Sequence, residues 1–295
     1  MFKPQLVLDI NKELAKKTTK VHSKTFIVSE KLDGWYVYIT YEPITGFNVP
    51  CSRAGRVIPS LTFLQQVLNS LHIPVKESFV LIGEAIIPNT PFHILNGTLN
   101  KSKGNCDCTD VHIVLHDMLR SSNLCANSRY INLTNFYEAF LRNSMYFGLL
   151  PVLTTMRFDL NELYKVFDKI VNSGGEGIVC KNVDSSYEFG KRNGNLLKLK
   201  AEVEKDLLCI AVEYSIGEMG NSGLSLILTD NNDVRCKVVI NSLQLITSIN
   251  IDNNFVVGKV VNVKAMEELS NGVLRQPTFN RIRDDVTCFE YRVWY

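Results

Sequence analysis

Lys31 stands in a four-residue segment, Lys31-Leu32-Asp33-Gly34, that could supply a covalent nucleophile. A primary amine attacks only when it is neutral, and a free lysine with a pKa of about 10.4 is neutral in less than ~0.1% of molecules at pH 7. Burial and neighbouring cations favour the neutral amine. Asp-Gly between two β-type runs is also typical of a tight hairpin, where a lysine is usually only solvated. The segment therefore needs further chemical groups before it indicates catalysis.

Such groups follow along the chain, where charged residues interrupt or end apolar runs. A charge inside an apolar strand is costly unless it is paired or binds a ligand. Lys198 and Lys200 alternate with leucines, which places both on one face of a strand. Each residue alone could lie on a half-exposed strand, but two glutamates and several cations on successive strands predict a site for phosphate and a metal ion. The residues concerned are Arg53, Glu84, His116, Asp117, Glu176, Lys198 and Lys200.

The elements that must position these groups are a mixture of strands and helices. Runs rich in β-branched and aromatic residues predict strands. Leucine and valine at helical spacing predict helices over residues 61–71 and 160–170. The predicted strands of this part cover residues 25–30, 35–41, 79–87 and 111–115.

The tail of the chain has a different pattern, with a boundary expected near residue 201. Its short β-type segments are separated by Gly, Asn and Asp, which is typical of a small barrel or sandwich. These segments cover residues 207–214, 224–228, 234–240 and 256–264.

Composition excludes some classes of protein and leaves others open. The 295 residues suit about two domains, and a net charge of only +2 means that any surface for nucleic acid must be a local basic patch. The sequence has neither a signal peptide nor an apolar run long enough for a membrane span, so we expect no membrane partner. Eight scattered cysteines predict reduced thiols and a cytoplasmic location, or a nuclear one. Cys106 and Cys108 form a lone Cys-x-Cys, which is a weak zinc signal.

The order of these motifs resembles the ATP-dependent DNA ligases, whose superfamily also contains RNA ligases and mRNA-capping guanylyltransferases. Lys31 to Gly34 matches the K-x-D-G nucleophile motif, and residues 52–55 match an R-x-G element. The next four motifs of the family are matched by Glu84, His116-Asp117, Glu176-Gly177 and Lys198-x-Lys200. The match ends at residues 274–285, where Pro277 and Phe279 precede an R-x-R pair. One such motif is weak, whereas six or seven in the family's order are strong. The small size of the chain resembles viral and bacteriophage members.

The resemblance implies an α+β fold with two domains. Residues 1–201 would form a nucleotidyltransferase (adenylation) domain of antiparallel sheets flanked by helices, and residues 202–295 would form an OB-fold β-barrel. It also implies nick sealing in duplex DNA by a monomer. Lys31 would take AMP from ATP, pass it to the 5′-phosphate of the nick, and the 3′-hydroxyl would then displace it.

Site roles follow from the same resemblance. Lys31, Asp33, Lys198 and Lys200 would be catalytic. Glu84 and Glu176 would hold Mg²⁺, or Mn²⁺, although Glu84 could instead bind the ribose. His116 occupies the place where the family usually stacks an aromatic ring on adenine. The residues expected to bind ATP are Ser29, Glu30, Leu32, Arg53, Glu84, His116, Arg192, Arg281 and Arg283.

Two positions depart from the family pattern. The arginine usual five residues after the nucleophile is Tyr36, and the lysine that often ends the last motif is Val286. Tyr36 either belongs to an altered contact with the nick or points into the core, since residues 35–39 form an apolar run.

Two other functions remain open at this point. One is the same chemistry on another substrate, as in an RNA ligase or a guanylyltransferase; Pro277 and Phe279 favour a DNA ligase. The other is a non-catalytic OB-fold protein that binds nucleic acid. Such a protein would have no use for Lys31 together with the glutamates and lysines of the other motifs.

Overall fold

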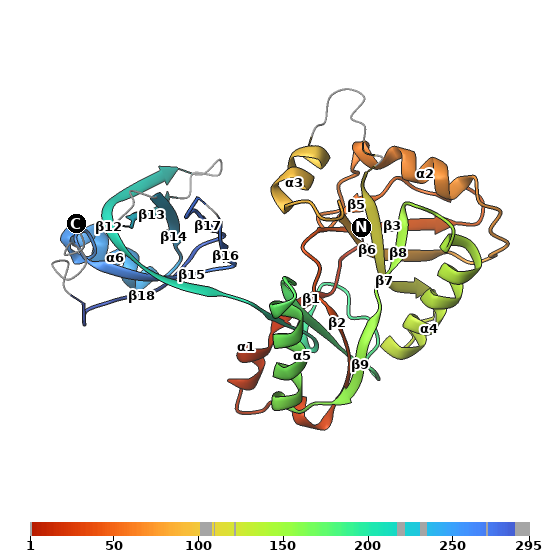
Figure 1. Ribbon diagram of the computed structural model, residues 1–295, viewed down its shortest axis with the longest axis horizontal. Helices are drawn as coiled ribbons and strands as arrows, with labels where there is room; N and C mark the ends of the chain where they lie inside the picture. The colour runs from red at the N-terminus through yellow and green to blue at the C-terminus, as the bar shows by residue number, and fades with distance from the viewer. Residues whose placement is uncertain are drawn as a thin grey trace. The chain divides into compact units, whose positions relative to one another are not determined.

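The structure is a computed structural model of the chain, and it describes residues 2–100, 108, 110–120, 122–216, 222–230, 235–269 and 271–286. The chain forms two compact units, residues 1–200 and 201–295. The first unit contains two sheets, which we call the lysine sheet and the glutamate sheet after the residues they carry (Figure 1).

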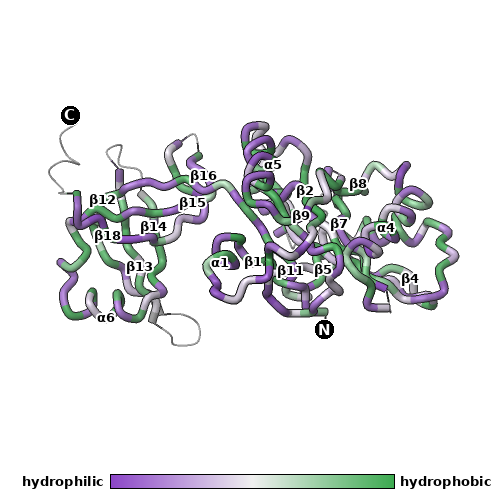
Figure 2. The backbone as a smooth tube through the Cα atoms, turned by 90° about the horizontal axis from the view of Figure 1, so that it is seen from below, coloured by the Kyte–Doolittle hydropathy of each residue, from purple (hydrophilic) through white to green (hydrophobic). Residues whose placement is uncertain are grey.

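The lysine sheet has five strands in the order β1-β11-β10-β2-β9. One of its faces packs against α1 (Ile10–Leu14) and α5 (Leu160–Asn172), and α5 begins where the Asp159 side chain accepts from the backbone N–H groups of Asn161 and Glu162. Hydrophobic and hydrophilic residues alternate along α5, as Figure 2 shows, so its apolar side covers the core. The strands are β1 (Leu6–Asp9), β2 (Thr25–Glu30), β9 (Val152–Arg157), β10 (Gly177–Asn182) and β11 (Arg192–Lys200).

The glutamate sheet has six strands, in the order β4-β3-β6-β7-β8 with β5 paired to β3. Its core face packs against helices α2 (Thr62–Asn69), α3 (Phe92–Asn100) and α4 (Ala126–Phe136), and a π-helical turn, Tyr137–Leu141, extends α4. The strands are β3 (Trp35–Glu42), β4 (Gly46–Phe47), β5 (Cys51–Ser52), β6 (Phe79–Ile86), β7 (His112–Arg120) and β8 (Phe147–Leu149).

The Lys31–Gly34 segment crosses from one sheet to the other, because β2 belongs to the lysine sheet and β3 to the glutamate sheet. The alternative interpretation of Asp33-Gly34 as a tight hairpin is therefore wrong. A Cβ added at Gly34 would lie 2.6 Å from the backbone oxygen of Ala85, so only glycine lets the crossing run this close to β6. This crossing places Lys31 between the two sheets.

The second unit is one sheet of five antiparallel strands in the order β14-β13-β12-β15-β18. Alternate residues such as Leu224, Leu226 and Leu228 face its core. Helix α6 (Leu243–Ile251) joins β14 to β15. The strands are β12 (Val203–Ile216), β13 (Ser222–Thr229), β14 (Arg235–Ile240), β15 (Val260–Ala265) and β18 (Thr278–Ile282), beside a small pair of β16 (Glu267–Glu268) and β17 (Leu274–Arg275).

Several expectations from the sequence need correction. The sheets of the first unit are mixed rather than antiparallel, since β1 pairs parallel with β11 and β7 pairs parallel with β8. Residues 256–259 do not belong to β15. None of the described cysteines forms a disulfide, and Cys108 is buried in the core, while Cys106 lies outside the described residues.

None of the helices in the described residues is both long and apolar enough to cross a membrane.

Candidate active site

Lys31 lies at the mouth of a pocket between the lysine sheet and the glutamate sheet. Its backbone N–H donates to the carbonyl of Gly177 (2.8 Å), which continues the pairing of β2 with β10 by one residue. Its Nζ donates to Oε2 of Glu176 at 2.7 Å, and the two side chains are 24% and 12% exposed. The expected nucleophile and an expected metal ligand are therefore direct neighbours.

Gly177 allows this closeness. Its φ is +148°, and a Cβ added there would lie 2.2 Å from the carbonyl oxygen of Leu199 on β11. Any other residue would push β10 away from β11 and move Glu176 with it. The Glu176-Gly177 pair of the sequence motif is thus a steric requirement as well as a chemical one.

Lys198 and Lys200 lie on the same open face of the lysine sheet as Lys31. Lys200 is the cross-strand partner of Gly177, and Lys198 is that of Val179. The intervening Leu197 and Leu199 are buried on the other face, as the alternation predicted. Burial lowers the pKa of Lys198, and the charges of Lys200 and Lys31 lower it further. Three lysines thus share this face, and such a cluster of cations suits a polyphosphate.

Glu84 faces this cluster from the glutamate sheet, where Tyr36 on β3 is its cross-strand partner. Burial raises the pKa of Glu84 to about 7, although Lys31 and Arg53 act in the opposite direction. Glu84 lines the pocket, whereas Glu176 lies beside it next to Lys31, close enough for its charge to raise the pKa of Glu84 further. A hard divalent ion prefers such oxygen donors and keeps several waters, and the pair fits that requirement. Within the described residues, no group of three or more His, Cys, Asp or Glu side chains could hold a metal alone.

His116 owes its position to a β-bulge. The pairing of β6 with β7 shifts between Ile82↔Asp117 and Gly83↔Leu115, so His116 is the extra residue and its ring lines the pocket. Burial, with the nearby Lys181, lowers its pKa to about 3, so the imidazole is neutral. A neutral ring on the pocket wall can stack on a base, as its place in the motif suggested.

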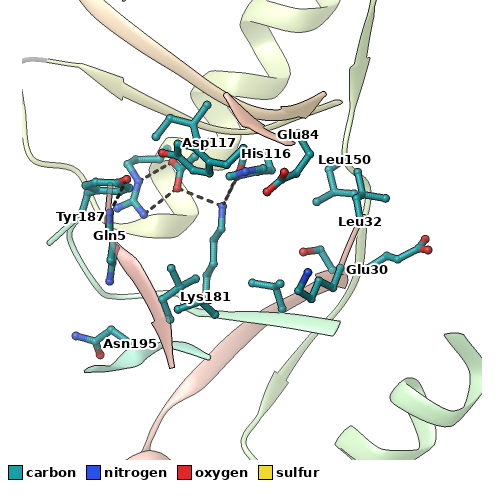
Figure 3. A pocket seen from close by; sticks show the side chains of 18 of the residues that line it. Gln5, Glu30, Leu32, Glu84, His116, Asp117, Leu150, Lys181, Tyr187 and Asn195 are labelled. Atoms are coloured by element: carbon teal, nitrogen blue, oxygen red, sulfur yellow. Dashed lines mark hydrogen bonds and ion pairs between the residues drawn. The ribbon is translucent and has the colours of Figure 1, made fainter. Parts of the chain in front are cut away.

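A buried ion network closes the pocket on one side, and the sequence did not predict it (Figure 3). Asp117 accepts from Arg129 Nε at 2.8 Å and from Lys181 Nζ at 3.2 Å. Lys181 also donates to the carbonyl of His116 at 2.6 Å. Burial alone would raise the pKa of Asp117, but the two cations outweigh it and hold the pKa well below its usual range. The available signal was Arg129, which falls on the buried stripe of α4 with Ala126 and Leu133.

Tyr36 lies on the pocket face of β3, so it does not point into the main core between this sheet and its helices. Its ring nevertheless packs against a smaller buried cluster on the pocket side, which includes Ile82 and Tyr187, so the core alternative is confirmed in part. The neighbouring Val37 and Ile39 face that core, and Tyr36 lines the pocket instead. The guanidinium carbon of Arg53 lies 4.7 Å from the centre of the Tyr36 ring. Tyr187 was also missed by the sequence; it lines the same pocket from the connection after β10.

The other expected residues have different positions. Ser29 and Leu32 line the pocket, and so does Glu30, whose carboxylate points away from Lys181 and Asp117 (Figure 3). Asp33 and Arg192 are not among the lining residues, and Arg192 is exposed at the start of β11.

Arg281 and Arg283 belong to the second unit. Arg283 donates to Asp285 (2.7 and 2.8 Å) and to Asp206, whereas Arg281 is exposed. Asp206 in turn accepts from Asn262 at 2.7 Å. Arg283 is therefore already bound by two carboxylates of its own unit.

Comparison with known proteins identifies the family. Residues 4–200, two thirds of the chain, match the family described as the ATP dependent DNA ligase domain. DNA ligase 1 of Arabidopsis thaliana is 27% identical over 205 residues, which cover 65% of this chain and 25% of that protein. The DNA ligase of Enterobacteria phage T3 is 26% identical over 133 residues, or 43% of this chain and 38% of that one. The chain belongs to the ATP-dependent DNA ligase family.

A solved structure from a study of Lig E DNA ligases supports the fold. It has a TM-score of 0.69 over 96% of this chain and 100% of that one, at 19% identity. The matched part covers a quarter of the plant protein and 38% of the phage protein, so the match spans less than half the length of either relative.

Glu84 makes the stability of the protein depend on pH. Its folded pKa of about 7 lies above its ordinary value of 4.5, so the folded protein keeps a proton that the unfolded chain loses in this range. The free energy of unfolding should therefore fall as the pH rises from 4.5 to 7, by up to about 3 kcal/mol at about 1.4 kcal/mol per pKa unit. Glu84→Gln should remove this decrease and be more stable than the parent at pH 8. Urea unfolding of both proteins at pH 5, 6, 7 and 8 measures the difference; parallel curves would contradict the prediction.

Proposed function

We propose that this protein seals nicks in duplex DNA with ATP, through a lysyl-AMP intermediate on Lys31. The observation that carries the proposal is the position of Lys31, whose Nζ lies 2.7 Å from Glu176 on a sheet face that also carries Lys198 and Lys200. A binding module would gain nothing from an amine held against a carboxylate in this way.

In the first step Nζ of Lys31 attacks the α-phosphorus of ATP. A phosphorus–nitrogen bond forms, the bond to the bridging oxygen of pyrophosphate breaks, and the amine loses its proton. Glu176 orients the amine beforehand through its hydrogen bond. Lys198 and Lys200 balance the charge of the transferring phosphate. We assign Asp33 to the same catalytic group on the basis of its motif.

In the second and third steps the nucleotide moves to DNA and leaves. An oxygen of the 5′-phosphate at the nick attacks the phosphorus of lysyl-AMP and releases the lysine. The 3′-hydroxyl then attacks the activated 5′-phosphate, and AMP departs. Arg53 at the mouth of the pocket can bind the ribose or the nick phosphate, because a guanidinium matches phosphate geometry.

Nucleotide binding is assigned to the pocket walls. The neutral His116 ring would stack on the adenine, and Ser29, which is buried in the lining, would bind its amino group. Glu30 and Leu32 contribute beside them. Glu84 and Glu176 would hold Mg²⁺, or Mn²⁺ as a substitute. The bound ion would polarise the phosphate oxygens. The role of Glu84 on the ribose remains the alternative.

We further propose that residues 1–201 are the adenylation domain and that residues 202–295 are an OB-fold. The support is topological. Five antiparallel strands in the order β14-β13-β12-β15-β18 suit a five-stranded barrel, and along the chain α6 lies between β14 and β15. Arg281 and Arg283 on this domain would contact the pyrophosphate, together with Arg192. Because Arg283 already has two carboxylate partners, Arg281 is the more available cation. The protein would act on nicked duplex DNA as a monomer.

Labelling with radioactive nucleotides tests the function. The protein is incubated with labelled ATP or GTP and Mg²⁺, and then with nicked DNA or nicked RNA duplexes. We expect label from ATP, its transfer to the 5′-phosphate of nicked DNA, and sealing. Label from GTP alone would indicate a capping enzyme, and sealing of RNA alone would indicate an RNA ligase. If neither nucleotide labels the protein, the protein is a non-catalytic nucleic-acid-binding protein.

A further inference from the structure

The pocket of Lys31 continues into a groove that carries three cations. Lys31, Arg53 and Arg56 line it, with Glu84 as the acidic member among the described lining residues. The groove starts where the transferring phosphate would lie, so it suits a further phosphate of the substrate. The arginine that the family usually has at position 36 is a tyrosine in this chain. The cation that binds this phosphate must therefore be a different residue, and some feature of the chain must orient it.

Arg53 sits on a tight turn whose backbone is well held. Ser52 N–H donates to the carbonyl of Arg56 and Gly55 N–H donates to that of Ser52, both at 2.8 Å. Gly55 has a φ of +78°, which favours glycine. The turn therefore fixes the Cα of Arg53, but its long side chain must be oriented by other contacts.

The ring of Tyr36 supplies such a contact. The guanidinium carbon of Arg53 lies 4.7 Å from the ring centre, within the range of a cation–π interaction. Among the described residues no carboxylate forms an ion pair with Arg53. The Tyr36 ring also lies 6.3 Å, centre to centre, from the ring of His116, and it lines both the pocket and the groove. An arginine at position 36 would instead place a second positive charge against Arg53.

We propose that Tyr36 is a positioning residue: its ring holds the Arg53 guanidinium over the groove beside Lys31, where Arg53 binds the 5′-phosphate at the nick. This rests on the proposed function for the identity of the phosphate. The cation at this place thus comes from Arg53 on the turn after β5, and the tyrosine provides the surface on which that cation rests.

The test is the preference of the full-length protein for a nick with a 5′-phosphate over one with a 5′-hydroxyl, measured by binding in EDTA so that no transfer occurs. The parent should prefer the phosphate. Arg53→Gln should reduce the preference about 10-fold, because it removes a charge-assisted hydrogen bond. Tyr36→Leu should reduce it about 2- to 5-fold, as expected for loss of an exposed cation–π contact, and Tyr36→Phe should keep it.

A double-mutant cycle separates this role from a merely structural one. If Tyr36 acts through Arg53, Tyr36→Leu should change the preference less than about 1.5-fold in the Arg53→Gln background. Tyr164→Leu, on α5, is the matched control and should have no effect. Tyr36→Met, with thermal melting of every variant, replaces Tyr36→Leu if the latter does not fold.

Three results would overturn the proposal: equal affinity of the parent for both nicks, a loss in Tyr36→Phe as large as in Tyr36→Leu, or additive effects in the cycle. None of these measurements needs catalysis. A protein that shows the predicted coupling but fails to seal would contradict only the proposed function.

Discussion

Replacing Lys31 with alanine is expected to abolish transfer of label from ATP to the protein, with a loss of about 1,000-fold or more. The phosphoramidate requires a primary amine at this position, and alanine has none. Lys31→Arg should be equally inactive, although it keeps a positive charge next to Glu176. Binding of nicked DNA should largely survive in both variants, because it depends on many phosphate contacts.

The matched control for this experiment is Lys191→Ala, since the Lys191 side chain is 72% exposed and its ion pair with Glu188 is long, at 3.9 Å. It should label like the parent. Substantial labelling of Lys31→Ala, with an unchanged melting temperature, would show that another residue is the nucleophile.

Replacing Asp117 with alanine should cause a large loss of stability, about 3–5 kcal/mol in the free energy of unfolding. The side chains of Asp117 and Arg129 are only 6% and 5% exposed, and that of Lys181 is 16% exposed. Removing the carboxylate leaves two cations with little access to water. Because the pKa of Asp117 is depressed in the folded protein, its contribution is present above the unfolded pKa of about 3.9 and is lost on acidification.

Glu138→Ala provides the comparison for this loss. It removes the carboxylate of an ion pair with Arg142 on the surface, where the two side chains are 49% and 71% exposed. Its effect should be below about 0.5 kcal/mol. Denaturant unfolding at pH 7 measures both variants. Equal effects, or a change below about 1 kcal/mol for Asp117→Ala, would mean that the buried network is not a main support of the pocket.

Several parts of the fold followed from local sequence patterns. The strands β2, β3 and β6 and the helix α5 begin where β-branched residues and helical spacing placed them. Helix α6 was missed, because its sequence, Leu243–Ile251, is rich in isoleucine and exposes apolar side chains at both ends. Ser242 caps its start, since the hydroxyl accepts from the N–H of Leu245, and Ile249 packs into the core of the second unit, a tertiary contact that the local sequence does not reveal.

The chemical groups of the candidate site could be predicted from the sequence alone. An amine, two carboxylates and several cations must be present for this chemistry, and their types and order along the chain are visible without coordinates. The alternation of Lys198 and Lys200 with leucines also placed them correctly on one face, because the two-residue period of a strand is a local property.

Which of these groups lie close together followed only from the tertiary structure. It showed that Lys31 to Gly34 crosses between two sheets instead of forming a hairpin, that a bulge turns His116 into the pocket, and that Tyr36 lies under Arg53. It also brought Asp117 on β7 together with Arg129 on α4. These outcomes depend on the pairing of strands distant in sequence and on burial, which sets the cost of an unpaired charge; neither is contained in the local pattern of residues.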